Sequence, residues 1–132
     1  MVMDEERRQR LSDALSGLAV LRDEAHAIAR SKGWHEDASV KRLPELLCLV
    51  HSEVSEVLEA YREGCDVTGA TEMLAHACVP EAKPEGIASE LADVIIRVLD
   101  ICGLYGIDIG WAVARKMDYN RTRPQRHGGK VV

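Results

Sequence analysis

The chain has 132 residues and 46% of them are apolar, which is enough for one domain with a hydrophobic core and too many for a disordered chain. Aromatic residues make up only 4% and phenylalanine is absent, so the core must consist of small aliphatic side chains, which suits packed helices better than a β-sandwich. The formal net charge of −5 argues against a nucleic-acid polymer or an anionic membrane as a partner.

The chain shows no sign of a membrane segment or a disulfide framework. No stretch is apolar enough to span a bilayer, and the first residues lack the apolar centre of a signal peptide. The cysteines show no Cys-x-x-Cys spacing, so we expect free thiols in a reducing cytoplasm. The four cysteines are Cys48, Cys65, Cys78 and Cys102.

Apolar residues recur at helical spacing along most of the chain, which predicts an all-α fold with one domain over residues 1–132. The helix near residue 95 is apolar almost all round and should therefore be central. Glycines and prolines interrupt residues 64–86, a connecting segment that acts as a lid, an oligomer contact or neither. We expect helices at about 4–31, 43–63, 87–103 and 109–120, with a shorter one at about 71–77.

The helices predict a four-to-five-helix bundle that self-associates. The long first helix and the broad apolar helix near residue 95 expose more apolar surface than one small bundle covers. Glycine or aspartate marks several helix boundaries: Gly33 and Gly64 follow helix ends, and Asp108 is a good N-cap. Residues from about 121 to 132 form a basic, polar C-terminal tail that includes Arg123 and Lys130.

Two pairs of carboxylates are the most informative local pattern. Glu53 and Glu56 lie three residues apart within one predicted helix, and Glu90 and Asp93 repeat this spacing in another. Each pair therefore lies on one side of its helix, and packing the helices together would gather four carboxylates in one cleft. Four such acids repel one another unless a cation lies among them, and oxygen ligands favour Mg2+ or Mn2+.

Other interpretations of these residues remain open. The acids are surface charges if Arg97 pairs with Asp93 and Arg62 with Glu59. A di-iron bundle would need Glu-x-x-His pairs, which these motifs lack. Trp34, just after the first helix, is either a core residue or a flat surface for a nucleobase. The histidines at positions 26, 35 and 76 are isolated in sequence and carry no motif.

The motifs resemble those of the MazG-like family of the all-α nucleoside triphosphate pyrophosphohydrolase superfamily. The resemblance covers roughly residues 34–130. It rests on Glu53-x-x-Glu56 followed by Glu90-x-x-Asp93, on the context of the second pair in residues 83–97, on Lys116-Met-Asp-Tyr-Asn120, and on the ending His127-Gly-Gly-Lys130. The paired acids together with Lys-x-x-x-Asn are fairly specific, whereas either alone is not.

The resemblance implies a helical bundle that forms a homodimer or homotetramer. It implies Mg2+-dependent hydrolysis of a nucleoside triphosphate to the monophosphate and pyrophosphate. By this similarity the four acids would be metal ligands, Lys116 and Asn120 would contact the phosphates, and Trp34 would lie near the base. Lys116, Arg123 and Lys130 would neutralise the pyrophosphate leaving group.

One position departs from the family pattern. Many members have Glu-Glu-x-x-Glu, and here the first of these positions is Ser52. The general base and the number of metal ions are therefore open. Two alternatives follow: a catalytically weak regulatory bundle that binds a nucleotide or a metal, and an oligomeric bundle whose acids only solvate it.

Overall fold

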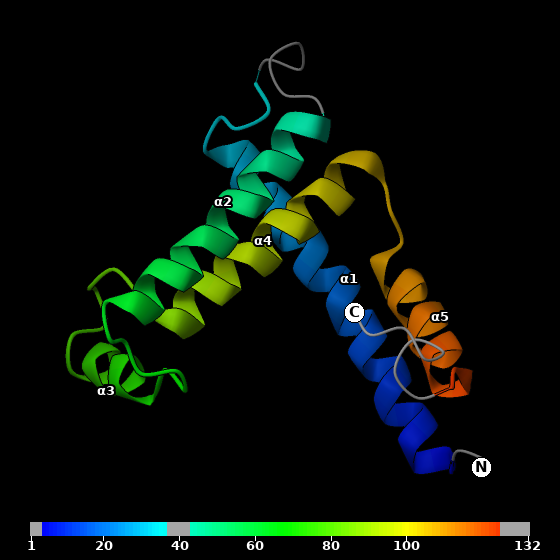
Figure 1. Cartoon of the computed structure of the whole chain (residues 1–132). Helices are drawn as coiled ribbons and strands as arrows, with labels where there is room; N and C mark the ends of the chain where they lie inside the picture. The colour runs from blue at the N-terminus through cyan, green and yellow to red at the C-terminus, as the bar shows by residue number, and fades with distance from the viewer. Residues whose placement is uncertain (1–3, 37–42, 125–132) are drawn as a thin grey trace.

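Every regular element in the described part of the chain is a helix. The computed structural model describes residues 4–36 and 43–124, and it contains no strand among them. The expectation of an all-α fold is confirmed for these residues (Figure 1). The helices are α1 (Glu5–Ser31), α2 (Leu43–Arg62), α3 (Ala70–Cys78), α4 (Ile87–Tyr105) and α5 (Ile109–Thr122).

Helix α4 packs against both α1 and α2, in line with the central position that its apolar sequence predicts. It packs along α2 and is crossed by α1, and α5 packs along α1 (Figure 1). The α2–α4 pair forms one arm of the molecule, with α3 at its far end, and the α1–α5 pair forms the other arm. None of the described helices is both long and apolar enough to cross a membrane.

Short polar contacts set the helix boundaries. Asp108 begins α5, and its Oδ1 accepts a hydrogen bond from the backbone N–H of Trp111 at 3.0 Å, which is the predicted N-cap. Gly33 and Gly64 follow α1 and α2 with φ values of +81° and +85°, which glycine adopts without a steric penalty. The short helix expected at about 71–77 is present as α3.

The end of α4 differs from the expectation. The helix continues past Gly103 to Tyr105, and the left-handed residue that ends it is Gly106, with φ +66°. Gly103 serves packing instead, because a Cβ atom there would lie 2.5 Å from the Cβ of His26 on α1. This missing side chain allows α1 and α4 to cross closely.

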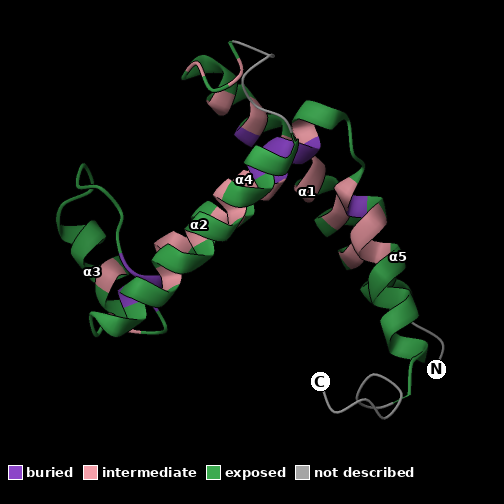
Figure 2. Ribbon diagram, turned by 45° about the horizontal axis from the view of Figure 1, so that its top comes forward, coloured by how far each residue is buried: buried purple, intermediate pink, exposed green. Residues whose placement is uncertain are grey.

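The buried core is small and lies mainly where α4 meets α1 and α2 (Figure 2). Along α2 and α4, large apolar side chains stay open to solvent: Val54 is 52% exposed, Leu58 59% and Ile95 57%. A single chain therefore leaves part of its apolar surface uncovered. The buried apolar residues are Ala25, Leu46, Ala60, Ile87, Leu99, Ile101 and Cys102.

Candidate functional site

Three of the four predicted acids meet between α2 and α4. Glu53 of α2 and Glu90 and Asp93 of α4 each offer a carboxylate oxygen, and these oxygens lie within 4.8 Å of one another. Glu56 is one turn further along α2, is exposed, and lies outside this group. The acid cluster, as we call Glu53, Glu90 and Asp93, offers only oxygen donors, which fits Mg2+ or Mn2+ better than a softer metal.

The charge of the acid cluster is costly without a cation. The pKa of Glu90 is raised, first because partial burial removes its carboxylate from water, and then because of the charges of Asp93, Glu56 and Glu53. The charge of Lys83 lowers the pKa of Glu90, and its effect is the smallest of these. A bound divalent cation would relieve the repulsion, which is what a metal site made of carboxylates requires.

An arginine bridges the two helices beside the acid cluster. Arg97 of α4 donates its Nε–H to Glu53 Oε1 at 2.8 Å, and both side chains are largely buried. Arg97 thus pairs with Glu53 and not with Asp93, the partner considered from the sequence. Arg62 does pair with Glu59, at 3.4 Å. Glu53 is more buried than Asp93, so its attraction to Arg97 is less screened by water.

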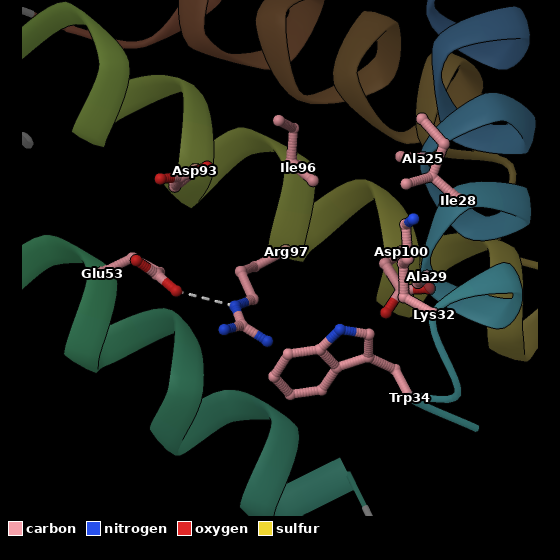
Figure 3. Close-up of a pocket in the computed structure, with 10 residues that line it drawn as sticks. All are labelled: Ala25, Ile28, Ala29, Lys32, Trp34, Glu53, Asp93, Ile96, Arg97 and Asp100. Atoms are coloured by element: carbon pink, nitrogen blue, oxygen red, sulfur yellow. Dashed lines mark hydrogen bonds and ion pairs between the residues drawn. The ribbon is translucent and has the colours of Figure 1, made fainter. Parts of the chain in front are cut away.

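Trp34 lies over the other side of Arg97. The guanidinium carbon is 4.7 Å from the centroid of the Trp34 ring, within the range of a cation–π contact. Trp34 is 43% exposed, so it is not a core residue. It lines a groove of about 260 Å³ in which Arg97 separates Trp34 from Glu53 and Asp93 (Figure 3).

The groove joins the two kinds of surface that a nucleotide needs. Glu53 and Asp93 lie at one end, and the Trp34 ring lies at the other, near Asp100. The sequence pointed to both ends and to Arg97, but it did not predict the Glu53–Arg97 pair, because this pair depends on how α2 packs against α4. The groove is lined by Ala25, Ile28, Ala29, Lys32, Trp34, Glu53, Asp93, Ile96, Arg97 and Asp100.

The predicted phosphate-binding residues lie elsewhere in the chain. Lys116 and Asn120 are exposed on α5, and Arg123 follows this helix. Helix α5 packs along α1, on the arm opposite to the far end of α2 and α4 (Figures 1 and 2). The Lys116 Nζ lies 5.5 Å from the ring centroid of Tyr119, and Lys116 does not line the groove. Lys130 lies outside the described residues.

The structure also contains a cluster of two histidines and one aspartate that the sequence did not predict. His26 and His35 both contact Asp100, although the sequence separates the histidines from this aspartate by 74 and 65 positions. No spacing rule indicates such a group, because it forms only where the crossing of α1 and α4 brings its members together. Its only sequence signal is the presence of two histidines near the end of the first helix.

Comparison with known proteins identifies no relative of this chain. The chain matches no family model, and it matches no curated protein and no solved structure. The resemblance to the MazG-like family therefore rests on the motifs Glu53-x-x-Glu56, Glu90-x-x-Asp93 and Lys116-x-x-x-Asn120. The chemistry of the groove must support any function independently of that resemblance.

Proposed function

We propose that the chain is a Mg2+-dependent nucleoside triphosphate pyrophosphohydrolase that releases a nucleoside monophosphate and pyrophosphate. The observation that carries the proposal is the shared groove, which has Glu53 and Asp93 at one end and Trp34 at the other. A nucleotide has the same division, with a flat apolar base and a charged phosphate chain. The resemblance to the MazG-like family selects this reaction among those that such a groove supports.

The acid cluster would hold the cation. Glu53, Glu90 and Asp93 supply oxygen donors from two helices, with Glu56 close enough to add to their mutual repulsion. When bound, Mg2+ or Mn2+ screens the triphosphate from these acids and polarises the phosphorus under attack. Arg97 keeps Glu53 in place, so that the carboxylate faces the cluster without swinging into solvent.

Trp34 and Arg97 would bind the nucleoside. A nucleobase stacked on an aromatic ring gains about 1–3 kcal/mol and requires no particular base. Trp34 is exposed enough for such contact and is supported by the Arg97 guanidinium. Stacking anchors one end of the substrate while the acid cluster and its cation orient the phosphates.

Hydrolysis needs no covalent intermediate. Water adds its hydroxyl to one phosphorus, the bond from that phosphorus to the bridging oxygen breaks, and the remaining proton is carried by the products or the buffer. Cationic and amide groups must balance the charge on the departing pyrophosphate. Lys116, Asn120 and Arg123 are suitable donors, and Lys130 is a further candidate outside the described residues.

A second copy of the chain would bring these donors to the groove. Val54, Leu58 and Ile95 leave apolar stripes exposed on α2 and α4, which a homodimer or homotetramer would cover. Since α5 lies on the other arm of its own chain, we propose that Lys116 and Asn120 of one protomer serve the groove of its partner. The site would then be incomplete in a monomer.

Two observations favour a rival function. The ion pair with Arg97 neutralises part of the acid cluster, and Ser52 replaces an acid that the resemblance would lead us to expect. Both features suit a catalytically weak regulatory bundle that binds a nucleotide or a metal without turnover. Nucleotide binding at equilibrium, measured beside product formation, separates the two functions.

The test is pyrophosphate release from a panel of ribo- and deoxyribonucleoside triphosphates, with Mg2+ or with a chelator. Turnover that requires the metal and yields a monophosphate supports the proposal. Tight nucleotide binding without turnover supports the regulatory function. The absence of both nucleotide binding and turnover across the panel contradicts the proposal and leaves only a bundle that binds a metal.

A further inference from the structure

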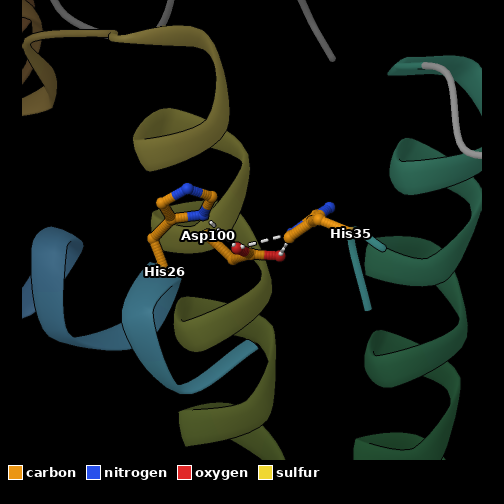
Figure 4. Close-up of side chains that lie close together, drawn as sticks. All are labelled: His26, His35 and Asp100. Carbon is orange, nitrogen blue, oxygen red and sulfur yellow. Dashed lines mark hydrogen bonds and ion pairs between the residues drawn. The ribbon is translucent and has the colours of Figure 1, made fainter. Parts of the chain in front are cut away.

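Two histidines and one aspartate converge where α1, α4 and the segment after α1 meet (Figure 4). The Nδ1 of His26 lies 2.9 Å from Asp100 Oδ1, and the Nε2 of His35 lies 2.9 Å from both carboxylate oxygens. The two imidazole rings are 5.3 Å apart between centroids and tilted by 45°. One nitrogen of each ring is therefore directed at the same carboxylate.

The fold buries this group and holds it in place. The side chains of His26, His35 and Asp100 are only 19%, 10% and 12% exposed. His26 packs against Gly103, where any side chain would collide with it, and His35 comes directly after the turn at Gly33. Three separate segments thus contribute one ligand-type group each to a single point.

We propose that His26, His35 and Asp100 form a site for a divalent transition metal ion, and that Zn2+ is the ion it binds. Two imidazole nitrogens and one carboxylate oxygen suit Zn2+, Co2+ and Ni2+, whereas Mg2+ prefers oxygen ligands. The three ligand atoms lie within 4.8 Å of one another. This site is separate in residues and in donor type from the acid cluster of Glu53, Glu90 and Asp93.

The distances from each imidazole nitrogen to the carboxylate are close to those around a bound ion. Ligand atoms about 2.0–2.1 Å from a tetrahedral Zn2+ lie roughly 3.3 Å apart. The nitrogen–oxygen distances of 2.9 Å are a few tenths of an ångström shorter and are those of ordinary hydrogen bonds. A neutral imidazole can move its proton to its other nitrogen, so each coordinating nitrogen can release its hydrogen bond and bind the metal instead.

The fourth position of the metal would face the groove. Asp100 lines the same groove as Trp34 and Arg97, so a water or a small anion on the ion can exchange with solvent there. Three protein ligands with one open position are usual for zinc that is accessible to small molecules. The bound ion would also tie α1 and His35 to α4, which fixes the segment that carries Trp34.

Co2+ spectroscopy tests this proposal on the full chain without reference to activity. One equivalent of Co2+ is expected to give the intense visible absorption of a tetrahedral site, and Zn2+ should displace it while excess Mg2+ should not. X-ray absorption at the zinc edge on the unaltered protein should show two imidazole ligands. Loss of a ligand in His35→Gln or Asp100→Asn should weaken Zn2+ binding by about 100-fold or more.

Matched variants separate this site from other ligands. Cys102→Ser, His76→Gln and Glu90→Gln should leave the Co2+ spectrum and the zinc affinity unchanged, since none of these residues belongs to the proposed site. A visible spectrum that stays octahedral for Co2+ in Glu90→Gln, thiolate charge-transfer bands that vanish in Cys102→Ser, or zinc affinity unaltered by His35→Gln would each overturn the proposal. Absorption at the zinc edge that lacks imidazole ligands would overturn it even where a variant fails to fold.

Discussion

Arg97 of α4 donates its Nε–H to Glu53 Oε1 of α2 at 2.8 Å while its guanidinium carbon lies 4.7 Å from the centroid of the Trp34 ring. One side chain thus contacts both ends of the groove, the carboxylates and the aromatic ring. This relationship links metal binding to nucleoside binding in the proposed function. The proposed function therefore predicts that Arg97 affects stability and nucleotide affinity together.

Arg97→Met should lower both stability and activity. It leaves Glu53, whose side chain is 17% exposed, without its cationic partner, which costs about 1–3 kcal/mol of unfolding free energy. Trp34 loses its support, so KM for the nucleotide should rise. Thermal denaturation and steady-state kinetics measure the two effects. Arg62→Met is the control, because its pair with Glu59 is exposed and should contribute at most about 1 kcal/mol. Equal melting temperatures for the two variants would contradict the role of Arg97.

Glu90→Gln should stabilise the metal-free protein at neutral pH. The pKa of Glu90 in the folded protein is raised above its ordinary value of 4.5. The contribution of Glu90 to the free energy of unfolding is therefore fully present below pH 4.5 and is lost as the pH rises through the higher pKa of the folded state. Removing the charge should raise the melting temperature in chelator by about 1–3 °C at pH 7, with the difference disappearing towards pH 4. Mg2+ should then stabilise the parent protein more than the variant. A stabilisation of the same size in Glu63→Gln, an exposed control on the same arm, would remove the acid cluster as its cause.

Two glycine-to-alanine changes should act in opposite directions. Gly103→Ala puts a Cβ within 2.5 Å of the His26 Cβ, which should force α1 from α4 and cost about 1–3 kcal/mol. Gly17→Ala meets nothing within 4 Å on helix α1 and should stabilise the fold by roughly 0.5–1 kcal/mol. Chemical denaturation of both variants measures the difference. Equal effects would show that the helix crossing is looser than the structure indicates.

Activity should depend on two copies of the chain. Asp93→Asn disables the acid cluster and Lys116→Ala removes the cationic donor Lys116 from α5, so each variant alone should lose at least about tenfold in kcat/KM. Mixing the two after brief unfolding and refolding should restore part of the activity, because some mixed dimers hold one intact groove. Light scattering should show a dimer or tetramer. A stable monomer with full activity would exclude a shared site.

The sequence predicts the helices well because they depend on local spacing, and it predicts three of the four acids that it brings together, since Glu56 lies outside the acid cluster. The apolar repeats determine α1, α2, α4 and α5, and the spacing of Glu90 and Asp93 determines which side of α4 they share. The Arg97–Glu53 pair and the contacts of Asp100 were not predictable in this way, because they depend on how helices distant in sequence pack together. Gly103 illustrates the limit: in sequence it resembles a helix end, whereas in the structure it is a helix contact.

The most direct test of the proposed function is pyrophosphate release from nucleoside triphosphates by the parent chain and by Asp93→Asn, with Mg2+ present. Asp93 contributes to the acid cluster and also lines the groove, so the variant should bind a nucleobase yet lose turnover by about 100-fold or more. Circular dichroism should show that both proteins retain their helices. Turnover by Asp93→Asn at the parental rate, or no pyrophosphate from any nucleotide with the folded parent protein, would contradict the proposed function.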